Sequence, residues 1–392
     1  MAASEGPLAG VKVLDLSRIL AGPTCTQLLG DLGASVLKVE NPRTGGDDTR
    51  QWGPPFVKDG AQDTDLSAYF MSANRNKRSI PVDIASADGQ ATLRRLAGMA
   101  DILIENFKPG GLEKHGLGWE SVHALNPRLV YCSISGYGQT GPNRDRPGYD
   151  LVAQAFGGIM SLTGPVEGPP MKVGVGIADV MCGMYATVGI LAALRHAEAT
   201  GEGQRIDLAL VDSQVAWTIN EGVATRLTGE APQRRGNEHP SIVPYALYPT
   251  ADGHVVVAVG NDAQFRRFCG AIGLSGAPDD PRFATNPARL ENRDALTPLV
   301  EGAMSRLATD AAMAAIDAAG VTVGPVQTMP QVFASEQARA RGLCLDMEAD
   351  GATLPLIGNP LHLSRTPVTY RHPPPRFGAD ADRLERDDPF EE

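Results

Sequence analysis

Residues 11–39 contain two short apolar runs, Val11-Lys-Val-Leu-Asp15 and Ser35-Val-Leu-Lys-Val39, separated by the turn Ala21-Gly-Pro23 and a helix-forming stretch over 24–32. Each apolar run has the length and composition of a buried strand. A strand, a helix and a second strand form a β-α-β unit, and because such crossovers are right-handed, the two strands lie parallel in one sheet. This stretch therefore predicts an α/β fold.

The same alternation continues along the first half of the chain. It predicts strands over 79–83, 101–104 and 129–134 and a helix over 87–99. Elements in this order form an open parallel sheet with helices on both faces, so we expect a large Rossmann-like domain. The G-x-G-x-x-G fingerprint is missing after the first strand, which disfavours a nicotinamide-dependent oxidoreductase.

Changes in composition divide the chain into four expected parts. These are a large α/β domain over 1–200, a helical linker over 201–228, a small α+β domain over 229–325, and a return segment over 326–392. The return segment carries scattered prolines, and we expect it to pack on the large domain without a core of its own. Its acidic end, from Gly378 onward, is expected to be mobile.

Composition excludes several classes of function. The net charge of −11 over 392 residues argues against nucleic-acid binding. We expect no membrane-spanning segment, and the start lacks the pattern of a signal peptide. The five cysteines show no C-x-x-C spacing and the histidines no H-E-x-x-H motif, so we expect reduced thiols, no metal and a cytoplasmic protein.

Asp179 is an acid inside the apolar, glycine-rich run Val173–Tyr185. An unpaired carboxylate is costly to bury, so such a residue is usually paired, hydrogen-bonded or used in chemistry. Residues 180–198 read as a helix, and Asp is a favoured N-cap, so simple capping is one interpretation. A nucleophile is the other, and the two are compatible because a helix N-terminus stabilises a carboxylate.

Polar segments follow several of the expected strands. Arg18–Pro23 follows the first strand, where α/β folds bind ligands. The run Asn74-Arg-Asn-Lys-Arg78 is a dense cationic cluster, which is either a solvated face or a phosphate site. The stretches Ile104–Gly111 and Ser133–Pro142 also follow strands and are rich in small residues and backbone donors.

Read in order, the motifs A-G-P, V-x-K-V-E, D-D-T-R, N-x-N-K-R-S, E-N-F-x-P-G, G-Y-G-Q-T-G-P, G-Y-D and A-D-x-x-x-G resemble those of the class III CoA-transferase family, over Leu8 to Pro375. The resemblance is greatest to dicarboxylate enzymes of the succinate–hydroxymethylglutarate type. It implies coenzyme A as co-substrate, bound by the large domain, and an interlocked homodimer. It also implies a small acyl-CoA and a carboxylate as substrates, with succinyl-CoA as the expected donor.

The resemblance also implies a mechanism. The family's nucleophile falls on Asp179, which would pass through anhydride and aspartyl-CoA thioester intermediates. Gly260 and Asn261 match the family's mobile glycine loop, which shields such intermediates from water; an ordinary turn after a strand is the alternative interpretation of this short segment.

Contacts to CoA carry over by position. The matching residues are Leu20, Ala21, Asn41, Val82, Ala85, Asn106, Phe107, Lys114, Ser135, Gly136, Tyr137 and Gly138. Residues Leu20, Asn41 and Ser135 differ from those of formyl-CoA transferase, which argues against a formyl/oxalyl pair. We expect Arg18, Arg50 or His239 to bind the distal carboxylate of a dicarboxylate, because cations recognise carboxylates well.

Two other functions of the same fold remain open. Racemases of 2-methylacyl-CoA share the aspartate but use a histidine where this chain has Tyr149, which is a poor base near neutral pH. A non-catalytic CoA-binding protein is the other alternative, and the retained Asp179 argues against it.

Overall fold

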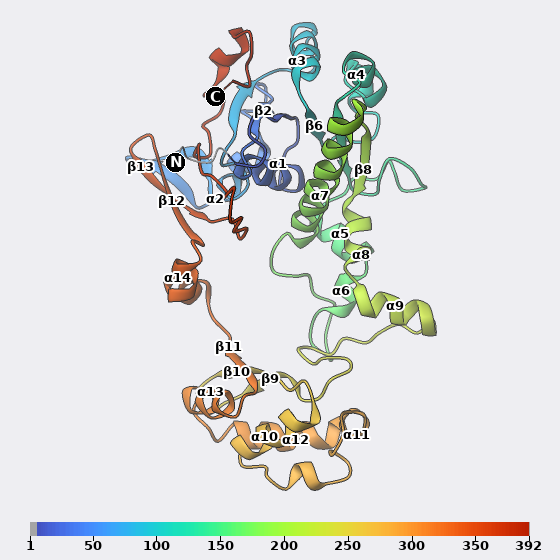
Figure 1. The fold of residues 1–392 in the computed structure, drawn as a ribbon, viewed down its shortest axis with the longest axis vertical. Coiled ribbons are helices and arrows are strands. Elements are labelled where there is room, and N and C mark those ends of the chain that lie inside the picture. The colour runs from blue at the N-terminus through green and yellow to red at the C-terminus, as the bar shows by residue number, and fades with distance from the viewer. Residues whose placement is uncertain (1–5, 392) are drawn as a thin grey trace. The chain divides into compact units, whose positions relative to one another are not determined.

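The computed structural model describes residues 6–391, and its largest element is a six-stranded parallel sheet with the order β5-β2-β1-β6-β7-β8 (Figure 1). Its strands are β1 (Lys12–Asp15), β2 (Ser35–Glu40), β5 (Arg78–Pro81), β6 (Ile102–Glu105), β7 (Val130–Ser135) and β8 (Arg205–Ala209). In the centre, Leu14 of β1 pairs in register with Leu37 of β2 and Leu103 of β6. The predicted α/β class with a Rossmann-like parallel sheet is confirmed.

Helices cover both faces of this sheet. On one face α1 (Ala21–Asp31) and α7 (Ile177–Thr200) share a core cluster that includes Val13 and Leu29. On the other face α3 (Ala87–Met99) and α4 (Trp119–Leu125) share a second cluster. By length and composition α7 could cross a membrane, in contrast to our expectation, but 56% of its most apolar window is buried inside the protein.

The chain forms two compact units. The large unit comprises residues up to Met160, Lys172–Ala231 and the chain from Glu336 onward, and the small unit comprises Ser161–Met171 and Pro232–Ser335. The remaining elements of the large unit are β3 (Phe56–Asp59), β4 (Gln62–Ser67), α2 (Ala68–Met71), α5 (Asp150–Phe156), α8 (Leu210–Ala216), α9 (Ile219–Thr228), α15 (Glu336–Ala340), β12 (Cys344–Ala349) and β13 (Ala352–Ile357). A short helix, α6 (Ile159–Leu162), spans the boundary.

Residues 201–228, expected to be a helical linker, contain the sixth strand of the sheet. Strand β8 pairs in parallel with β7, with Ile206 opposite Cys132 and Leu208 opposite Ile134. The strand is only five residues long and runs straight into α8, so its alternation is too short to stand out in the sequence.

The small unit is built on a three-stranded antiparallel sheet with the order β11-β10-β9. Its elements are β9 (Tyr245–Pro249), β10 (His254–Ala258), α10 (Asp262–Ala271), α11 (Asn286–Glu291), α12 (Arg293–Met304), α13 (Thr309–Ala318), β11 (Thr322–Pro325) and α14 (Met329–Ala334). Val255 and Val257 of β10 are fully buried against Phe265, Phe268 and Ile316 of the helices, so this unit has its own core.

The C-terminal segment is more ordered than its prolines suggested. Strands β12 and β13 form an antiparallel hairpin whose Met347 and Leu354 pack with Leu66 and Phe70. Alternating residues of the hairpin pack on α2 and β4, so this part of the segment shares a core cluster with the large unit.

The tail expected to be mobile is also packed on the large unit. Phe390 is 1% exposed within the cluster beneath α3, and its carbonyl accepts a hydrogen bond from the Ser35 hydroxyl at 2.6 Å. Asp388 pairs with Lys12 at 2.7 Å. A buried aromatic side chain, a hydrogen bond and an ion pair thus hold this stretch although its composition is acidic and polar.

Candidate active site

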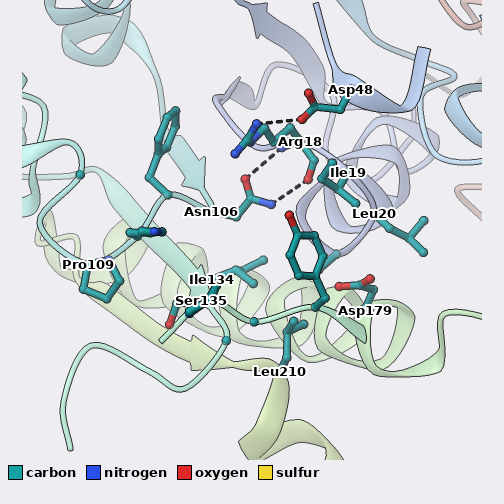
Figure 2. A pocket seen from close by; sticks show the side chains of 18 of the residues that line it. Arg18, Ile19, Leu20, Asp48, Asn106, Pro109, Ile134, Ser135, Asp179 and Leu210 are labelled. Carbon is teal, nitrogen blue, oxygen red and sulfur yellow. Dashed lines mark hydrogen bonds and ion pairs between the residues drawn. The ribbon is translucent and has the colours of Figure 1, made fainter. Parts of the chain in front are cut away.

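A cavity of about 670 Å³ opens at the carboxyl ends of β1, β6 and β7 (Figure 2). Its walls come from the turn Arg18–Ala21, the loop from Asn106 to Pro109, the end of β7 at Ser135 and Gly136, and the start of α7 at Asp179. Ligands of open parallel sheets bind at the carboxyl ends of the strands. The cavity is therefore the candidate active site.

Asp179 lies in the first turn of α7 and lines this cavity (Figure 2). It is 9% exposed, and within residues 6–391 no donor is hydrogen-bonded to its carboxylate. Burial, and then the nearby charge of Asp150, raise the pKa of Asp179 to about 7. The capping interpretation is wrong, since Gly176 is the N-cap and the Asp179 side chain caps nothing. A buried carboxylate without a partner is typical of a group used in chemistry.

Asp150 does the capping instead. Its carboxylate accepts from the backbone amide of Ala178 at 2.8 Å and from the side-chain amide of Gln154 at 2.7 Å. The Gln154 oxygen accepts from the Val173 amide at 2.9 Å, so the loop that leads into α7 is held at two points. Sequence reasoning considered the Gly148-Tyr-Asp150 motif only for its tyrosine and missed this role.

The turn after β1 is held in an unusual conformation. Ile19 has a φ of +73°, in the left-handed region that β-branched residues rarely occupy. Its amide donates to the Asp47 carboxylate at 3.2 Å. On the other side, Asn106 accepts from the Arg18 amide at 3.0 Å and donates to the Arg18 carbonyl at 2.7 Å (Figure 2). Hydrogen bonds from two elements thus fix this turn.

Asp47 is itself anchored by a buried ion pair. Lys38 donates to Asp47 at 2.8 Å and to the Ser17 carbonyl at 3.0 Å, and both ionic side chains are at most 1% exposed. Burial alone would raise the pKa of Asp47, but Lys38 beside it holds that pKa below its ordinary value. The charged form of Asp47 is therefore stabilised, and it keeps accepting from Ile19.

Basic side chains line the cavity. They are Arg18, Lys108, Lys114, His115 and Arg146. Arg18 pairs with Asp48 at 2.8 Å near the solvent. Lys108, His115 and Arg146 were not singled out from the sequence, because single cations in loops carry no signal until the fold gathers them. A polyanion such as a phosphate group fits such a lining.

The structure gathers about half of the predicted site residues in this cavity. These are Asp179, Arg18, Leu20, Ala21, Asn106, Phe107, Lys114, Ser135 and Gly136. The others lie outside its lining. These are Asn41, Arg50, Val82, Ala85, Tyr137, Gly138, His239, Gly260 and Asn261.

Arg50 has a structural place, which corrects the substrate role expected from the sequence. Its guanidinium is buried, donates to Glu40 at 2.6 and 2.8 Å and to Asp65 at 2.9 Å, and reaches the Pro375 carbonyl at 3.1 Å from both terminal nitrogens. It also stacks on Phe70. All five donors are therefore occupied within the protein, and none is available to a substrate.

The other large-unit residues outside the lining have local roles. The Asn41 side chain accepts from the Arg43 amide, and the Ala85 amide donates to Asp83. Val82 is buried in the core under α3. Tyr137 packs edge-on against Phe156 at 5.1 Å, and the Gly138 amide donates to the Ser135 hydroxyl.

Gly260, Asn261 and His239 belong to the small unit. Asn261 is the N-cap of α10, where its side chain accepts from the Gln264 amide at 2.9 Å, and the Gly260 amide donates to the Gln264 side chain at 2.7 Å. The His239 ring accepts from the Ser241 amide at 3.0 Å and packs on Tyr245.

An aromatic pair near Asp179 also escaped sequence reasoning. Burial, followed by the charge of Asp179, raises the pKa of Tyr69 to about 12, which places this phenol within electrostatic reach of the carboxylate. Tyr69 contacts Trp52 edge-on at 5.1 Å, and Trp52 lines the cavity. Trp52 begins the run Trp-Gly-Pro-Pro, and a tryptophan ahead of two prolines was the feature of the sequence that could have pointed to this pair.

The chain belongs to CoA-transferase family III, whose sequence model matches residues 8–381. It is therefore an enzyme of the CoA-transferase class, and the family predicted from the motifs is confirmed.

Relatives and solved structures agree with this assignment. The chain is 46% identical to the succinate–glutarate CoA-transferase of Agrobacterium fabrum (95% of this chain, 93% of the relative) and 41% identical to the human succinyl-CoA:glutarate CoA-transferase (95% and 84%). It is 37% identical to the succinyl-CoA:mesaconate CoA-transferase of Haloarcula hispanica (92% and 91%). A crystal structure of a CAIB/BAIF family protein from Brucella suis superimposes with a TM-score of 0.86 at 42% identity, covering 97% of this chain and 98% of that one.

Proposed function

We propose that this enzyme moves CoA from succinyl-CoA to a second dicarboxylic acid through covalent intermediates on Asp179. The observation that carries the proposal is a buried carboxylate at the wall of a cavity lined by basic side chains, with no hydrogen-bond partner in the described part of the chain. The names of the relatives supply the substrate class, because the three transferases above all use succinate or succinyl-CoA with another dicarboxylate.

The first half-reaction transfers CoA to the enzyme. An Asp179 oxygen attacks the thioester carbon of succinyl-CoA, the C–S bond breaks, and the CoA thiolate leaves behind a succinyl-aspartyl anhydride. The thiolate then attacks the aspartyl carbonyl carbon and succinate departs, which leaves an aspartyl-CoA thioester. A carboxylate suits this task because its anhydride and its thioester are of similar reactivity.

The second half-reaction returns the enzyme to its starting state. The acceptor carboxylate attacks the aspartyl carbonyl carbon and expels the CoA thiolate, giving a new anhydride. The thiolate attacks the acceptor's carbonyl carbon, and the Asp179 carboxylate leaves. Every step needs an ionised carboxylate as nucleophile or leaving group, so the pKa of Asp179 near 7 bears directly on the rate.

The lining of the cavity supports our proposal for how the CoA molecule binds. Lys108, Lys114 and Arg146 are suited to its phosphates, because charge-assisted contacts to phosphate oxygens are strong. Phe107 offers an apolar wall. Arg18 remains our candidate for the distal carboxylate of the acyl group, since Arg50 is buried in its own ion-pair network.

We further propose that the enzyme is a homodimer. The large unit exposes apolar side chains on three of its helices, a surface that a monomer would leave in water. These residues are Leu151, Val152 and Phe156 on α5, Met184, Tyr185 and Val188 on α7, and Ile219, Val223 and Leu227 on α9. Sedimentation should give twice the chain mass of 41.4 kDa, and a 41.4-kDa species at micromolar concentration would contradict the dimer.

The buried, reduced state of four of the five cysteines suits the cytoplasm.

The test of the covalent mechanism is trapping on Asp179. Hydroxylamine or borohydride added during turnover should modify Asp179 alone. Asp179→Ala and Asp179→Asn should abolish transfer while CoA binding survives, because an amide cannot form the anhydride. Substantial transfer by Asp179→Ala would refute the mechanism.

Substrate class has a separate test. Succinyl-CoA should outperform butyryl-CoA, its neutral analogue, by at least about tenfold, since a carboxylate–cation contact contributes roughly 1.5–3 kcal/mol. If Arg18 is the partner, Arg18→Ala should reduce this ratio more than it weakens CoA binding. Equal rates with the two donors would remove the dicarboxylate assignment and leave the transferase class in place.

A further inference from the structure

Helix α1 begins without a cap, and it begins at the cavity. Its N-cap residue Leu20 makes no side-chain capping bond, and Pro23 in the first turn has no amide hydrogen. Within residues 6–391 the amides of Ala21 and Gly22 have no hydrogen-bond acceptor. Two donors and the positive end of an 11-residue helix are therefore unsatisfied at one point of the active-site wall.

The packing of α7 on α1 brings Asp179 to this point. A Cβ atom at Gly183 would lie 2.6 Å from the Ala21 carbonyl oxygen, and one at Gly176 would lie 3.0 Å from the Leu20 side chain. Gly176, Asp179 and Gly183 are spaced i, i+3 and i+7, and residues at this spacing lie on one face of a helix. Asp179 therefore lies between the two positions of α7 that contact the start of α1. Leu20, Ala21 and Asp179 line the same cavity, and Figure 2 shows the side chains of Leu20 and Asp179 in it.

Among residues 6–391, a carboxyl group that is nine-tenths buried and has no hydrogen-bond partner thus lines the same cavity wall as a helix start whose first two amides have no acceptor. We infer that the amides of Ala21 and Gly22 form the oxyanion site for the intermediates on Asp179. This inference rests on the proposed covalent mechanism and adds to it the donors that the mechanism requires.

The chemistry accounts for the pairing. When the CoA thiolate or the acceptor carboxylate attacks the aspartyl carbonyl carbon, the carbonyl π electrons move to oxygen and a negative charge develops there. The charge returns to form the carbonyl when the leaving group departs. Preorganised amides stabilise this transient charge without reorganisation, and removing one such donor typically lowers kcat by about 10²–10³.

The hydrogen bonds that hold the turn before α1, together with the residue at its N-cap, explain why the amides of Ala21 and Gly22 have no acceptor among the described residues. Asp47 and Asn106 hold Ile19 and Arg18 in place, and Leu20 enters the helix at a φ of −139°. A polar side chain at the N-cap position could otherwise fold over this helix end, as Ser86 does at the start of α3, where it accepts from the Gly89 amide. The leucine cannot do this, because it has no acceptor.

The sharpest test replaces single amides by esters. L-Lactic acid at Ala21 and glycolic acid at Gly22 each remove one N–H and keep the shape of the chain. L-Lactic acid at Ala87 is the matched control, because Ala87 is the first residue of α3 and is exposed to solvent. The carbonyl before it, that of Ser86, accepts the first hydrogen bond of α3, just as the Leu20 carbonyl does in α1.

Single-turnover transfer from succinyl-CoA should slow by at least about 100-fold in each active-site ester. The KM for succinyl-CoA and the melting temperature should stay close to those of the Ala87 ester. If both active-site esters turn over at the control rate while hydroxylamine still labels Asp179, the oxyanion assignment is refuted and the covalent mechanism stands. If Asp179 is not labelled in the unmodified enzyme, the covalent mechanism fails, and the inference fails with it.

Discussion

Helices α1 and α10 begin in opposite ways. At the start of α10, Asn261 accepts from the Gln264 amide and Gln264 accepts from the Gly260 amide, so side chains cap this helix end. At the start of α1, the amides of Ala21 and Gly22 have no acceptor among the described residues. The sequence favoured Gly260 and Asn261 as catalytic, yet their hydrogen bonds are those of an ordinary capped helix. An uncapped helix end that lines the same cavity as a buried carboxylate is the better indicator of chemistry.

The largest effect should come from titrating Asp179, the carboxylate beside the open end of α1. Since the ionised form is the nucleophile and its pKa is raised to about 7, kcat/KM should fall about tenfold per pH unit below 7, reaching about 100-fold at pH 5. The measurement is kcat/KM for succinyl-CoA between pH 5 and 9, with circular dichroism at each pH as the control for folding. A flat profile down to pH 5 would show that Asp179 is not the titrating nucleophile.

Widening the contact between α7 and α1 should be the next largest change. Gly183→Ala puts a methyl group 2.6 Å from the Ala21 carbonyl, and overpacking of this kind costs about 1–3 kcal/mol. We expect kcat to fall about tenfold with little change in CoA affinity. Gly189→Ala on the same helix is the control, because its methyl group would lie 3.6 Å from Ile206, an ordinary contact. Equal kcat values for the two variants would argue against a role for the α1–α7 spacing.

The unpaired state of Asp179 should also appear as a cost in stability. Its pKa is raised in the folded state, so the folded protein holds this proton more tightly than the unfolded chain. The stability contributed by the protonated form is present at low pH and is lost as the pH rises through about 7. Asp179→Asn should therefore stabilise the protein by on the order of 2 kcal/mol at pH 8 and by much less at pH 5. Denaturant unfolding at both pH values measures this; a variant less stable at pH 8 would contradict it.

The smallest effect is expected at the capped end. Asn261→Ala removes the cap of α10, which should cost about 1 kcal/mol of unfolding free energy. If capping is its whole contribution, kcat should change by less than about twofold, and Asn261→Asp, which keeps the acceptor, should restore the stability. A large loss of kcat in both variants would restore Gly260 and Asn261 to the catalytic role that the resemblance implies.

The sequence predicted the regular parts of the fold well. The β-α-β units around Leu14 and Leu37 have strong apolar periods, so the parallel sheet and its covering helices followed directly. Strand β8 and the β12–β13 hairpin were missed, because five or six residues of weak alternation become strands only when a neighbouring edge pairs with them.

The site was predictable where a motif carries its own chemistry. Asp179 stood out because a charge in an apolar helix start is costly, whatever surrounds it. Arg50 was misassigned because an arginine in a loop looks the same in sequence whether its five donors face a substrate or Glu40 and Asp65. The amides of Ala21 and Gly22 gave no signal in the sequence, because every residue other than proline has a backbone amide. Only the structure around the start of α1 shows that these two have no acceptor among the described residues.

The burial of Phe390 has a consequence for how the protein folds during its synthesis on the ribosome. The large unit is assembled from three separate stretches of chain, and the last of them inserts this phenylalanine beneath the sheet that the first one begins. The small unit draws most of its residues from one stretch, Pro232–Ser335, which emerges before the large unit can be closed. The nascent protein must therefore hold an incomplete core, with the place of Phe390 exposed, until that residue has been synthesised. Apolar surface that is exposed in this way during synthesis is prone to aggregation and is the kind of surface that chaperones protect.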